Sequence, residues 1–357
     1  MKQIIQDLYN GKITLADLPE PKCLKNHLLI KTNFSLISAG TEKMLIDFGK
    51  ANLLSKAQQH PDKVSQVLDK IKSDGLISTI SAVNRKLEQP IPLGYCNVGV
   101  VTGIGEGVKG FSIGDRVVSN GPHAELFNVS QNLTVKIPNS VTDEEAVFSV
   151  LGAVGMQSVR LVNPSIGETI CVVGLGLIGH LIVKILLANG CNVIVIEKNQ
   201  DRLLEIENKY VTKICIKKDV NLNSIIENVT NGYGVDSVII ATATTSNEPL
   251  KNSIDIVKQN GKIVIVGTVG MNVSRDSLFR KQVTLQVSRS YGPGRYDINY
   301  EKKNIDYPFE LVRWTAQRNI SAFVDLLRTK KINLKDLPYK IFNFEDCINA
   351  YSYLDKK

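Results

Sequence analysis

The sequence predicts an α/β protein in which a doubly wound parallel sheet is joined to a second unit that is rich in β-strands. Residues 168–197 have the pattern of strand, glycine turn, helix and strand, and this alternation of strands and helices continues to Val287. Before residue 145, valine-rich runs and alternating apolar and polar residues are separated by glycine turns, which is typical of a small twisted barrel. A chain of 357 residues suits two such units.

The glycine turn has the spacing G-x-G-x-x-G, formed by Gly174, Gly176 and Gly179. In a Rossmann-type dinucleotide site the first glycine permits a tight turn, the second lets a pyrophosphate approach the backbone, and the third lets helix and strand pack closely. A helix that begins near Leu177 would point its free N–H groups at that pyrophosphate. Leu177 and Ile178 therefore join the glycines as predicted cofactor-binding residues.

Glu197 ends the second strand roughly twenty residues beyond the glycines, where a carboxylate can accept hydrogen bonds from the ribose 2′ and 3′ hydroxyls. A carboxylate repels a 2′-phosphate, so Glu197 favours NAD over NADP. Lys198 and Arg202 lie close enough to soften that preference, although a solvated helix start is the simpler interpretation of both. The strand ends at Thr242 and at Gly267–Thr268 should border the crevice for the nicotinamide half.

Composition limits the other function classes. The net charge of +8 and the pI near 9.0 come from lysines spread along the chain, without a basic run interleaved with aromatic residues, so nucleic-acid binding is not indicated. Anionic substrates remain compatible with such a surface. The sequence contains no apolar run of about eighteen residues and no signal-peptide core, so we expect a cytoplasmic protein.

The six cysteines are scattered without a C-x-x-C pair. Several of them fall inside apolar strand patterns, which favours buried, reduced thiols over a disulfide framework or a zinc-binding lobe. The cysteines are Cys23, Cys96, Cys171, Cys191, Cys215 and Cys347.

We expect three parts along the chain. Residues 1–145 form the β-rich unit, residues 146–289 form the dinucleotide-binding unit, and residues 290–357 return to the first unit. Within the first part, residues 43–90 change character and predict a helical insertion. One of its helices opens at His60-Pro61-Asp62 and ends at Gly75, and a second follows.

Two finer expectations concern local structure. Ser38 to Glu42 are predicted to form a loop. Beyond Arg289, two helices at about 314–329 and 344–354 are predicted to flank a short strand near Tyr339 to Phe342.

A β-rich first part, a central G-L-G-L-I-G half and a return at the C-terminus resemble the medium-chain dehydrogenase/reductase superfamily, whose fold combines a GroES-like catalytic domain with a Rossmann domain. Residues 35–57, 92–101 and 288–319 more narrowly resemble the N-terminal half of bi-domain oxidoreductases from bacterial surface-polysaccharide clusters. In those proteins a glucose-fructose-oxidoreductase-like unit follows, so the chain is either a stand-alone version or part of a longer protein. The resemblance also implies a homodimer.

The zinc-binding members of the superfamily differ from this chain at their metal ligands. A ligand cysteine is replaced by Ala39, and the G-H-E motif reads Gly94-Tyr95-Cys96. No cysteine or glutamate lies near Ser149 to Gly152. Catalytic zinc needs about three ligands of Cys, His, Asp or Glu type, so the sequence predicts that no metal is bound.

Without a metal, hydrogen-bond donors must polarise the substrate oxygen while hydride moves to or from the nicotinamide. The catalytic candidates are Thr41, at the family's hydroxyl relay position, and Tyr95, whose phenol can exchange a proton with an alcohol. Tyr95 can equally be a packed aromatic ring that fills the vacated metal site. Ser38, Cys96 and His123 are weaker substrate-binding candidates, and a lone histidine is more often structural.

Arg289, Tyr291, Arg295 and Tyr296 follow the last strand of the cofactor unit and surround Gly292-Pro293-Gly294. The arginines can recognise a carboxylate, phosphate or sugar hydroxyl through forked hydrogen bonds. The first three of these residues are predicted substrate-binding residues. An equally simple interpretation is that this segment locks the two units together.

The sequence therefore predicts a zinc-independent, NAD-preferring oxidoreductase that interconverts an alcohol and a ketone. The resemblance adds a sugar-like substrate, with nucleotide-linked sugars as one class. Two alternatives remain: a reductase of activated C=C bonds, and a nucleotide-binding partner or sensor without turnover.

Overall fold

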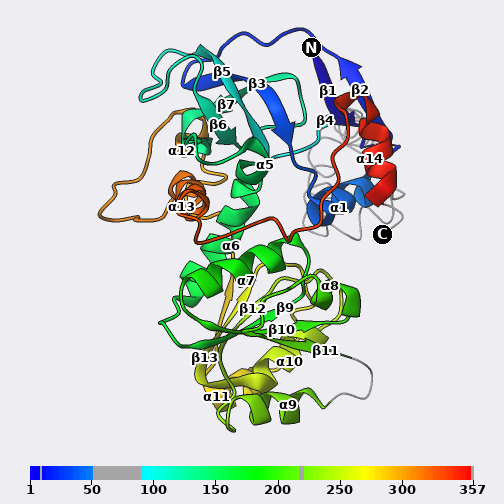
Figure 1. The fold of residues 1–357 in the computed structure, drawn as a ribbon, viewed down its shortest axis with the longest axis vertical. Helices are drawn as coiled ribbons and strands as arrows, with labels where there is room; N and C mark the ends of the chain where they lie inside the picture. The colour runs from blue at the N-terminus through cyan, green and yellow to red at the C-terminus, as the bar shows by residue number, and fades with distance from the viewer. Residues whose placement is uncertain (9, 51–89, 217–220, 355–357) are drawn as a thin grey trace, which may run out of the picture.

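The structure is a computed structural model, and it describes residues 1–8, 10–50, 90–216 and 221–354. Two lobes lie one above the other, with the β-rich lobe at the top of Figure 1 and the cofactor-type lobe below it. Helix α6 (Ser149–Val162) runs from the upper lobe into the lower one. Residues 51–89 of the predicted helical insertion at about 43–90, which include both of its expected helices, lie outside the described residues.

The lower lobe is built on one parallel sheet with the strand order β11-β10-β9-β12-β13-β14. This order places the first strand in the middle and reverses direction there, which is the arrangement of a doubly wound dinucleotide fold. The strands are β9 (Thr169–Val173), β10 (Asn192–Glu197), β11 (Val211–Cys215), β12 (Val235–Ile240), β13 (Val257–Ile265) and β14 (Thr284–Val287).

Both faces of this sheet are buried, because neighbouring residues along each strand enter different cores. On β9, Ile170 and Val172 pack into the core beneath α6 and α7 (Leu177–Ala188), whereas Cys171 packs into the core on the opposite face. Helices α9 (Leu222–Val229) and α10 (Glu248–Ile256) cover that opposite face. Burial on both faces explains why these strands are nearly continuous apolar runs instead of alternating ones.

The upper lobe contains a five-stranded sheet with the order β7-β3-β5-β6-β8 and a three-stranded sheet with the order β2-β1-β4, and every strand pair in the two sheets is antiparallel. The strands are β1 (Lys2–Gln6), β2 (Ile13–Asp17), β3 (His27–Ser35), β4 (Ile91–Pro92), β5 (Asn97–Ile104), β6 (Arg116–Ser119), β7 (Leu126–Ser130) and β8 (Thr134–Lys136).

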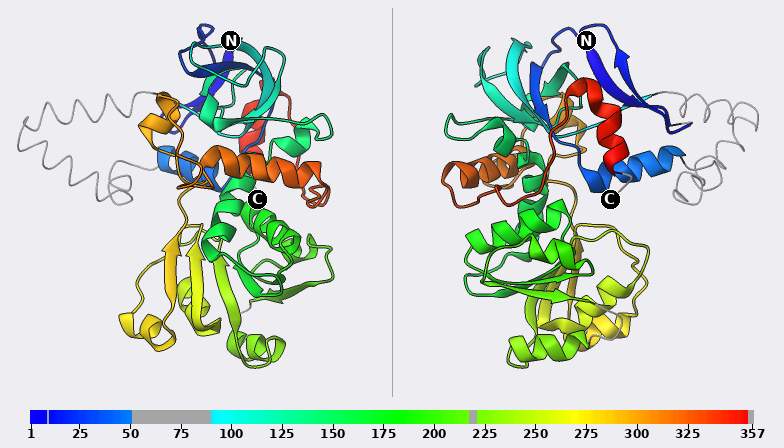
Figure 2. Two further views of the ribbon diagram at one scale, coloured as in Figure 1. Left: turned by 90° about the vertical axis from the view of Figure 1, so that its left-hand side faces the viewer. Right: turned by 45° about the vertical axis from the view of Figure 1, so that its right-hand side comes forward.

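The remaining helices cover the lobes and join them. The C-terminal helix α14 lies beside β1, β2 and α1 in Figures 1 and 2. The helices are α1 (Ala39–Lys50), α5 (Asp143–Ala146), α8 (Gln200–Leu204), α11 (Arg275–Lys281), α12 (Ile298–Lys302), α13 (Ala316–Arg328) and α14 (Cys347–Leu354).

The predicted fold class is confirmed: a parallel Rossmann sheet is combined with a β-rich, GroES-like unit. Helix α7 begins at Leu177, as expected, and Gly190 follows its C-cap with a φ of +80°. All six cysteines are free thiols, and four of them are buried. None of the helices in the described ranges is long and apolar enough to cross a membrane.

Two local predictions were wrong. Ser38 to Glu42 do not form a loop, because α1 begins at Ala39, and the Glu42 side chain supports its first turn by accepting the Ser38 N–H. No strand forms near Tyr339 to Phe342. Phe148 packs against the Tyr339 ring, so side-chain contact rather than strand pairing holds this segment.

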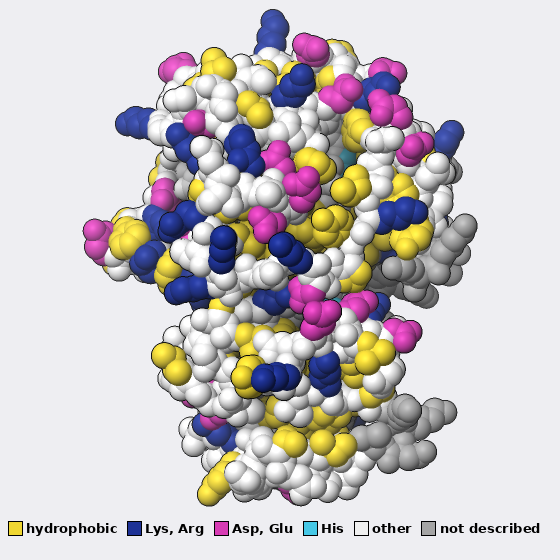
Figure 3. Space-filling model, in the orientation of Figure 1, with side chains coloured by type: hydrophobic (Ala, Val, Ile, Leu, Met, Phe, Trp, Pro, Cys, Tyr) yellow, Lys and Arg dark blue, Asp and Glu magenta, His cyan; other side chains and the backbone are white. Residues whose placement is uncertain are grey.

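Charged residues are distributed over the surface without forming one basic patch on the face shown in Figure 3. Lys and Arg side chains on that face are interspersed with Asp and Glu in both lobes. Long-range attraction of a polyanion needs a contiguous positive region. This face therefore lacks the electrostatic footprint of a nucleic-acid-binding surface.

Candidate active site

The three motif glycines have different surroundings. Gly174 follows β9 with a φ of +97°, and a Cβ atom there would lie 3.0 Å from the backbone nitrogen of Thr242. A Cβ atom at Gly179 would clash with the carbonyl oxygen of Gly174. At Gly176 the same position is open, with no other heavy atom within 4 Å. Packing within the chain thus requires the first and third glycines, whereas the second leaves room for a ligand to approach the backbone.

Helix α7 presents its N-terminus beside this open space. Gly176 is the N-cap, and it offers no side chain to accept a hydrogen bond from the first turn. Leu177 and Ile178 are half-buried at the start of the helix. Free N–H groups and the positive end of the helix dipole favour an anion at this place, so the turn fits the pyrophosphate of a dinucleotide.

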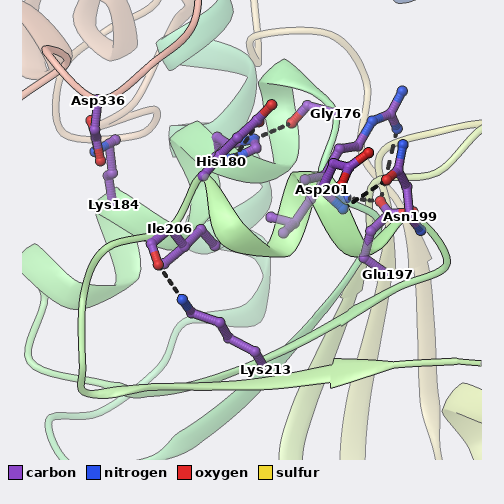
Figure 4. Close-up of polar contacts among 12 residues, drawn as sticks. Gly176, His180, Lys184, Glu197, Asn199, Asp201, Ile206, Lys213 and Asp336 are labelled. Atoms are coloured by element: carbon purple, nitrogen blue, oxygen red, sulfur yellow. Dashed lines mark hydrogen bonds and ion pairs between the residues drawn. The ribbon is translucent and has the colours of Figure 1, made fainter.

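Glu197 is held by backbone N–H groups from both sides of the turn. One carboxylate oxygen accepts the N–H of Leu175 at 2.7 Å, and the other accepts those of Lys198 at 2.7 Å and Asn199 at 3.0 Å. Figure 4 shows Glu197 beside Asn199 at the start of α8. A carboxylate has about four acceptor positions, so at least one remains for a ribose hydroxyl.

A pocket of about 280 Å³ lies beside Glu197. Its walls come from the ends of β9, β10 and β12 and from α10, so it lies at the carboxyl ends of the strands, where doubly wound sheets bind nucleotides. The lining residues include Gly174, Glu197, Lys198, Thr242, Thr244 and Asn252. The last two were not predicted from the sequence, because neither the loop after β12, which carries Thr244, nor helix α10, which carries Asn252, has a motif.

The other predicted cofactor residues surround the same region. Lys198 faces Glu248 at 3.4 Å, and Arg202 faces Glu197 at 3.8 Å. At the ends of β12 and β13, the N–H of Thr268 donates to the carbonyl oxygen of Thr242 at 3.1 Å. A Cβ atom at Gly267 would clash with that same carbonyl group, so a glycine lets the two strand ends approach closely.

Tyr95 and Thr41 lie together in the upper lobe. The Tyr95 hydroxyl donates to Oγ1 of Thr41 at 3.2 Å, although the two residues are 54 positions apart in the sequence. Burial raises the pKa of Tyr95, and hydrogen bonds to Ser38 and Thr41 offset part of the rise. The phenol therefore stays protonated at neutral pH and is available as a donor.

Ser38 and His123 meet at a buried carboxylate, that of Glu42. Glu42 accepts the N–H of Ser38 at 2.9 Å, Nε2 of His123 lies 3.1 Å away, and the Tyr351 hydroxyl donates to it at 2.6 Å. Nδ1 of His123 lies 2.8 Å from the Ser35 hydroxyl. Glu42, His123 and Tyr351 are 0%, 1% and 4% exposed.

Sequence reasoning missed Glu42 and Tyr351. Glu42 was placed in a predicted loop without a functional role, and Tyr351 lies 309 positions further along the chain. A motif with a fixed short spacing cannot indicate a contact between residues so far apart in the sequence. The pairing becomes visible only when α14 is placed beside α1.

Cys96 is fully buried. Burial raises the pKa of its thiol well above the usual range, and the nearby charge of Glu42 adds a smaller increase. A thiol with a raised pKa is a poor metal ligand and nucleophile at neutral pH. No group of three or more His, Cys, Asp or Glu side chains within the described ranges could hold a metal ion.

Arg289 and Arg295 are not brought next to Tyr95. They line a second pocket of about 380 Å³, together with Gln157, Tyr296 and Asp297, and this pocket includes neither Tyr95 nor Thr41. Arg295 forms an ion pair with Glu301 and stacks over Tyr296, with 4.2 Å between Cζ and the ring centre.

Tyr291 is only 2% exposed, and its hydroxyl has no hydrogen-bond partner among the described residues. It packs in the hydrophobic core that contains residues of both lobes, among them Phe323 and Leu151. The contacts of Tyr291 are those expected of a segment that holds the two lobes together. Arg289 and Arg295, in contrast, line the second pocket.

Comparison with known proteins agrees with this architecture. A family model described as "Zinc-binding dehydrogenase" matches residues 178–303. The chain is 22% identical to a sorbitol dehydrogenase of Halalkalibacterium halodurans over 270 residues, which cover 63% of this chain and 78% of that protein. It is 25% identical to D-guloside 3-dehydrogenase of Escherichia coli K12 over 274 residues, which cover 74% of each.

Among solved structures, a protein from Escherichia coli CFT073 described as a short chain alcohol dehydrogenase complexed with the cofactor NADH superposes with a TM-score of 0.74. Sequence identity is 18%, and the match covers 100% of this chain and 96% of that one. The fold and the glycine-rich turn define a protein of two lobes with the sheet and helix arrangement of a dinucleotide-binding site. The family model, the two dehydrogenase relatives and the shared fold support the medium-chain dehydrogenase/reductase superfamily and an NAD(P)-dependent oxidoreductase activity.

Proposed function

We propose that this protein is a zinc-independent dehydrogenase that interconverts an alcohol and a ketone on a sugar-like substrate and prefers NAD. The observation that carries the proposal is the 3.2 Å hydrogen bond between Tyr95 and Thr41, at the positions where the zinc enzymes have a ligand histidine and a relay hydroxyl. Relatives named sorbitol dehydrogenase and D-guloside 3-dehydrogenase support the alcohol and the sugar-like substrate.

The bound nicotinamide supplies or accepts the hydride. The protein must then orient and polarise the reacting oxygen. Tyr95 carries its single proton on a half-buried phenol, so it can turn that hydrogen from Thr41 to a ketone oxygen, while the Thr41 hydroxyl donates to the phenol oxygen in return and holds it in place. In the opposite direction the phenol oxygen accepts the proton of the alcohol hydroxyl as it passes its own proton to the Thr41 hydroxyl, which releases one to solvent, because each hydroxyl is both donor and acceptor.

The side chains around Tyr95 do not fit a catalytic zinc. Zinc prefers three protein ligands of Cys, His, Asp or Glu type with an open fourth position. The carboxylate of Glu42 and the imidazole of His123 are hydrogen-bonded to each other, and burial raises the pKa of the Cys96 thiol well above its usual range. Ala39 has no donor atom in its side chain. The proposed reaction therefore involves no metal ion.

Glu197 supports the preference for NAD, because its carboxylate faces the pocket where the ribose hydroxyls would bind. The contact of Arg202 with Glu197 leaves that guanidinium less available for a 2′-phosphate. We also propose that residues 146–289 act as the cofactor domain and residues 1–145 and 290–357 as the catalytic domain. Nucleotide-linked sugars and a glucose-fructose-oxidoreductase-like partner unit follow from the family resemblance alone.

The test compares the wild type with Tyr95→Phe. We expect Tyr95→Phe to reduce turnover about tenfold or more, the low end of what a general acid contributes, with unchanged NADH affinity. Turnover would be measured with NAD and a panel of sorbitol, a D-guloside and UDP-glucose, and NADH binding by calorimetry. Tyr233→Phe is the matched control, because the Tyr233 side chain is 80% exposed and lies in the cofactor lobe.

Three results would count against the proposal. Unchanged turnover in Tyr95→Phe would remove the catalytic role of the phenol. One tightly held zinc per chain in elemental analysis would contradict zinc independence. Reduction of a conjugated enone without any activity on alcohols would assign the protein to the C=C reductases, and NADH binding without turnover on either would indicate a sensor module.

A further inference from the structure

Three separate parts of the chain meet at the buried carboxylate of Glu42. Ser38 and Glu42 belong to the start of α1, His123 lies on the segment that leads into β7, and Tyr351 lies on α14. Together Glu42, His123 and Tyr351 form what we call the Glu42 cluster. The His123 and Tyr351 rings also meet edge to face, with 6.5 Å between their centres.

The Glu42 cluster is joined to both members of the proposed catalytic pair. Glu42 directly follows Thr41 in the chain, so fixing its carboxylate fixes the first turn of α1 that carries Thr41. His123 packs on the residue before Tyr95: a Cβ atom at Gly94 would lie 2.6 Å from Cγ of the His123 ring. In addition, the N–H of His123 donates to the carbonyl oxygen of Leu93 at 2.8 Å.

This connection explains the glycine at position 94. Gly94 has a φ of +89°, which disfavours any residue with a Cβ atom, and the imidazole occupies the space that a Cβ atom would need. The ring can therefore lie directly against the backbone that leads to Tyr95. Moving His123 would move the two residues on either side of Gly94 with it.

A buried carboxylate is costly unless its oxygen atoms are hydrogen-bonded. Here the partners come from a backbone N–H, an imidazole and a phenol, so Glu42 is satisfied only when all three parts of the chain are in place. These three partners favour a single arrangement of the three segments. An arrangement that lacks one partner would leave part of the buried Glu42 carboxylate without a hydrogen bond.

We propose that Glu42, His123 and Tyr351 are positioning residues that hold Thr41 and Tyr95 at hydrogen-bonding distance, and that α14 thereby completes the catalytic site. The inference rests on the proposed function of the Thr41–Tyr95 pair. It assigns a role to the C-terminal part of the chain that neither the cofactor motif nor the comparisons provide. None of the three residues is required to touch the substrate.

The test uses Tyr351→Phe, which removes one hydrogen bond and retains the ring, and Glu42→Gln, which retains the shape and removes the charge. We expect turnover to fall at least about fivefold in each, since a misplaced donor costs more than its own hydrogen bond. NADH affinity should stay within twofold of the wild type, because the Glu42 cluster shares no residue with the cofactor pocket. The control is again Tyr233→Phe.

A double-mutant cycle separates positioning from a purely structural role. If the Glu42 cluster acts through Tyr95, then adding Tyr351→Phe to Tyr95→Phe should lower turnover by less than twofold. If the double variant lost turnover by the product of the two single losses, the proposal would be overturned. Normal turnover of Tyr351→Phe with only a lowered melting temperature would overturn it as well.

The outcomes also distinguish this inference from the function on which it rests. If Tyr95→Phe is inactive but Tyr351→Phe and Glu42→Gln are fully active, only the positioning role fails. If Tyr95→Phe is fully active, the catalytic role of Tyr95 fails first. Should Glu42→Gln fail to fold, Tyr351→Phe alone decides the question, because a phenylalanine fills nearly the same volume.

Discussion

The two halves of the candidate site are assembled in opposite ways. The motif of the cofactor half is local: Gly174, Gly176, Gly179 and Glu197 all lie within one strand–turn–helix–strand unit. The catalytic half joins segments that are far apart, and the contact between Glu42 and Tyr351 spans 309 positions. Local geometry tolerates changes elsewhere in the chain, whereas the catalytic half depends on the packing of the whole upper lobe.

The strongest expected effect on the cofactor half comes from Gly179→Ala. Its Cβ atom would clash with the carbonyl oxygen of Gly174, so the turn must open. We expect a loss of about 2 kcal/mol or more in the free energy of unfolding, the usual range for overpacking, and a loss of NADH binding. Chemical denaturation and calorimetry measure the two effects.

Gly176→Ala is the matched comparison, because nothing lies within 4 Å of the added carbon atom. It should leave the free energy of unfolding nearly unchanged and weaken NADH about tenfold, by blocking the approach of the pyrophosphate. Equal destabilisation by the two alanines would show that the second glycine serves the turn and not the ligand.

A smaller effect is expected for Glu197→Gln. Replacing the carboxylate weakens its hydrogen bond to the ribose and removes its repulsion of a 2′-phosphate, while Arg202 loses its charged neighbour. NADH affinity should fall about tenfold and the ratio of NADPH to NADH affinity should rise. Glu207→Gln, at an exposed position in the same lobe, is the control for charge alone. An unchanged ratio would contradict the selective role of Glu197.

The smallest effect concerns His180, on the first turn of α7. It is buried, Nδ1 lies 3.2 Å from the Gly176 carbonyl oxygen, and Figure 4 shows it beside Gly176. Burial lowers the pKa of His180 below its ordinary value of about 6.5, despite the raising effect of Glu205. The unfolded chain therefore binds this proton more readily, and stability should fall as the pH drops below about 6.5.

Urea denaturation at two values of pH, about 7.5 and about 5.5, measures this dependence. The drop in the free energy of unfolding should be smaller in His180→Gln, which cannot titrate. An identical drop in the variant would assign the acid sensitivity to other groups.

These contrasts explain how much the sequence could predict. The order of strand, glycine turn, helix and strand is encoded within thirty consecutive residues, so α7 was expected to begin at Leu177 and does. The start of α1 at Ala39 was not expected, and a loop was predicted at Ser38 to Glu42 instead. The first turn is supported by the hydrogen bond from the Ser38 N–H to the Glu42 side chain, and no local sequence pattern indicates that bond. Tyr95 and Thr41 were paired through the family resemblance, and their distance became available only from the folded chain.

The arginine segment shows the limit of composition as a guide. Two arginines near two tyrosines fitted a polar recognition loop and a lock between the units equally well, and only the structure shows that Arg295 is paired with Glu301 and that Tyr291 lies inside the core. The charges that neutralise an arginine and the neighbours that bury a tyrosine come from elsewhere in the chain. Their arrangement is a property of tertiary packing, and residue type alone does not determine it.

Tyr351 lies on α14, so it leaves the ribosome after every other residue of the Glu42 cluster. A nascent chain can complete its dinucleotide fold first, while Glu42 still lacks its phenol partner. Helix α14 would then act as a check on completeness: a chain that ends before Cys347 would retain a cofactor fold and lack an organised catalytic centre.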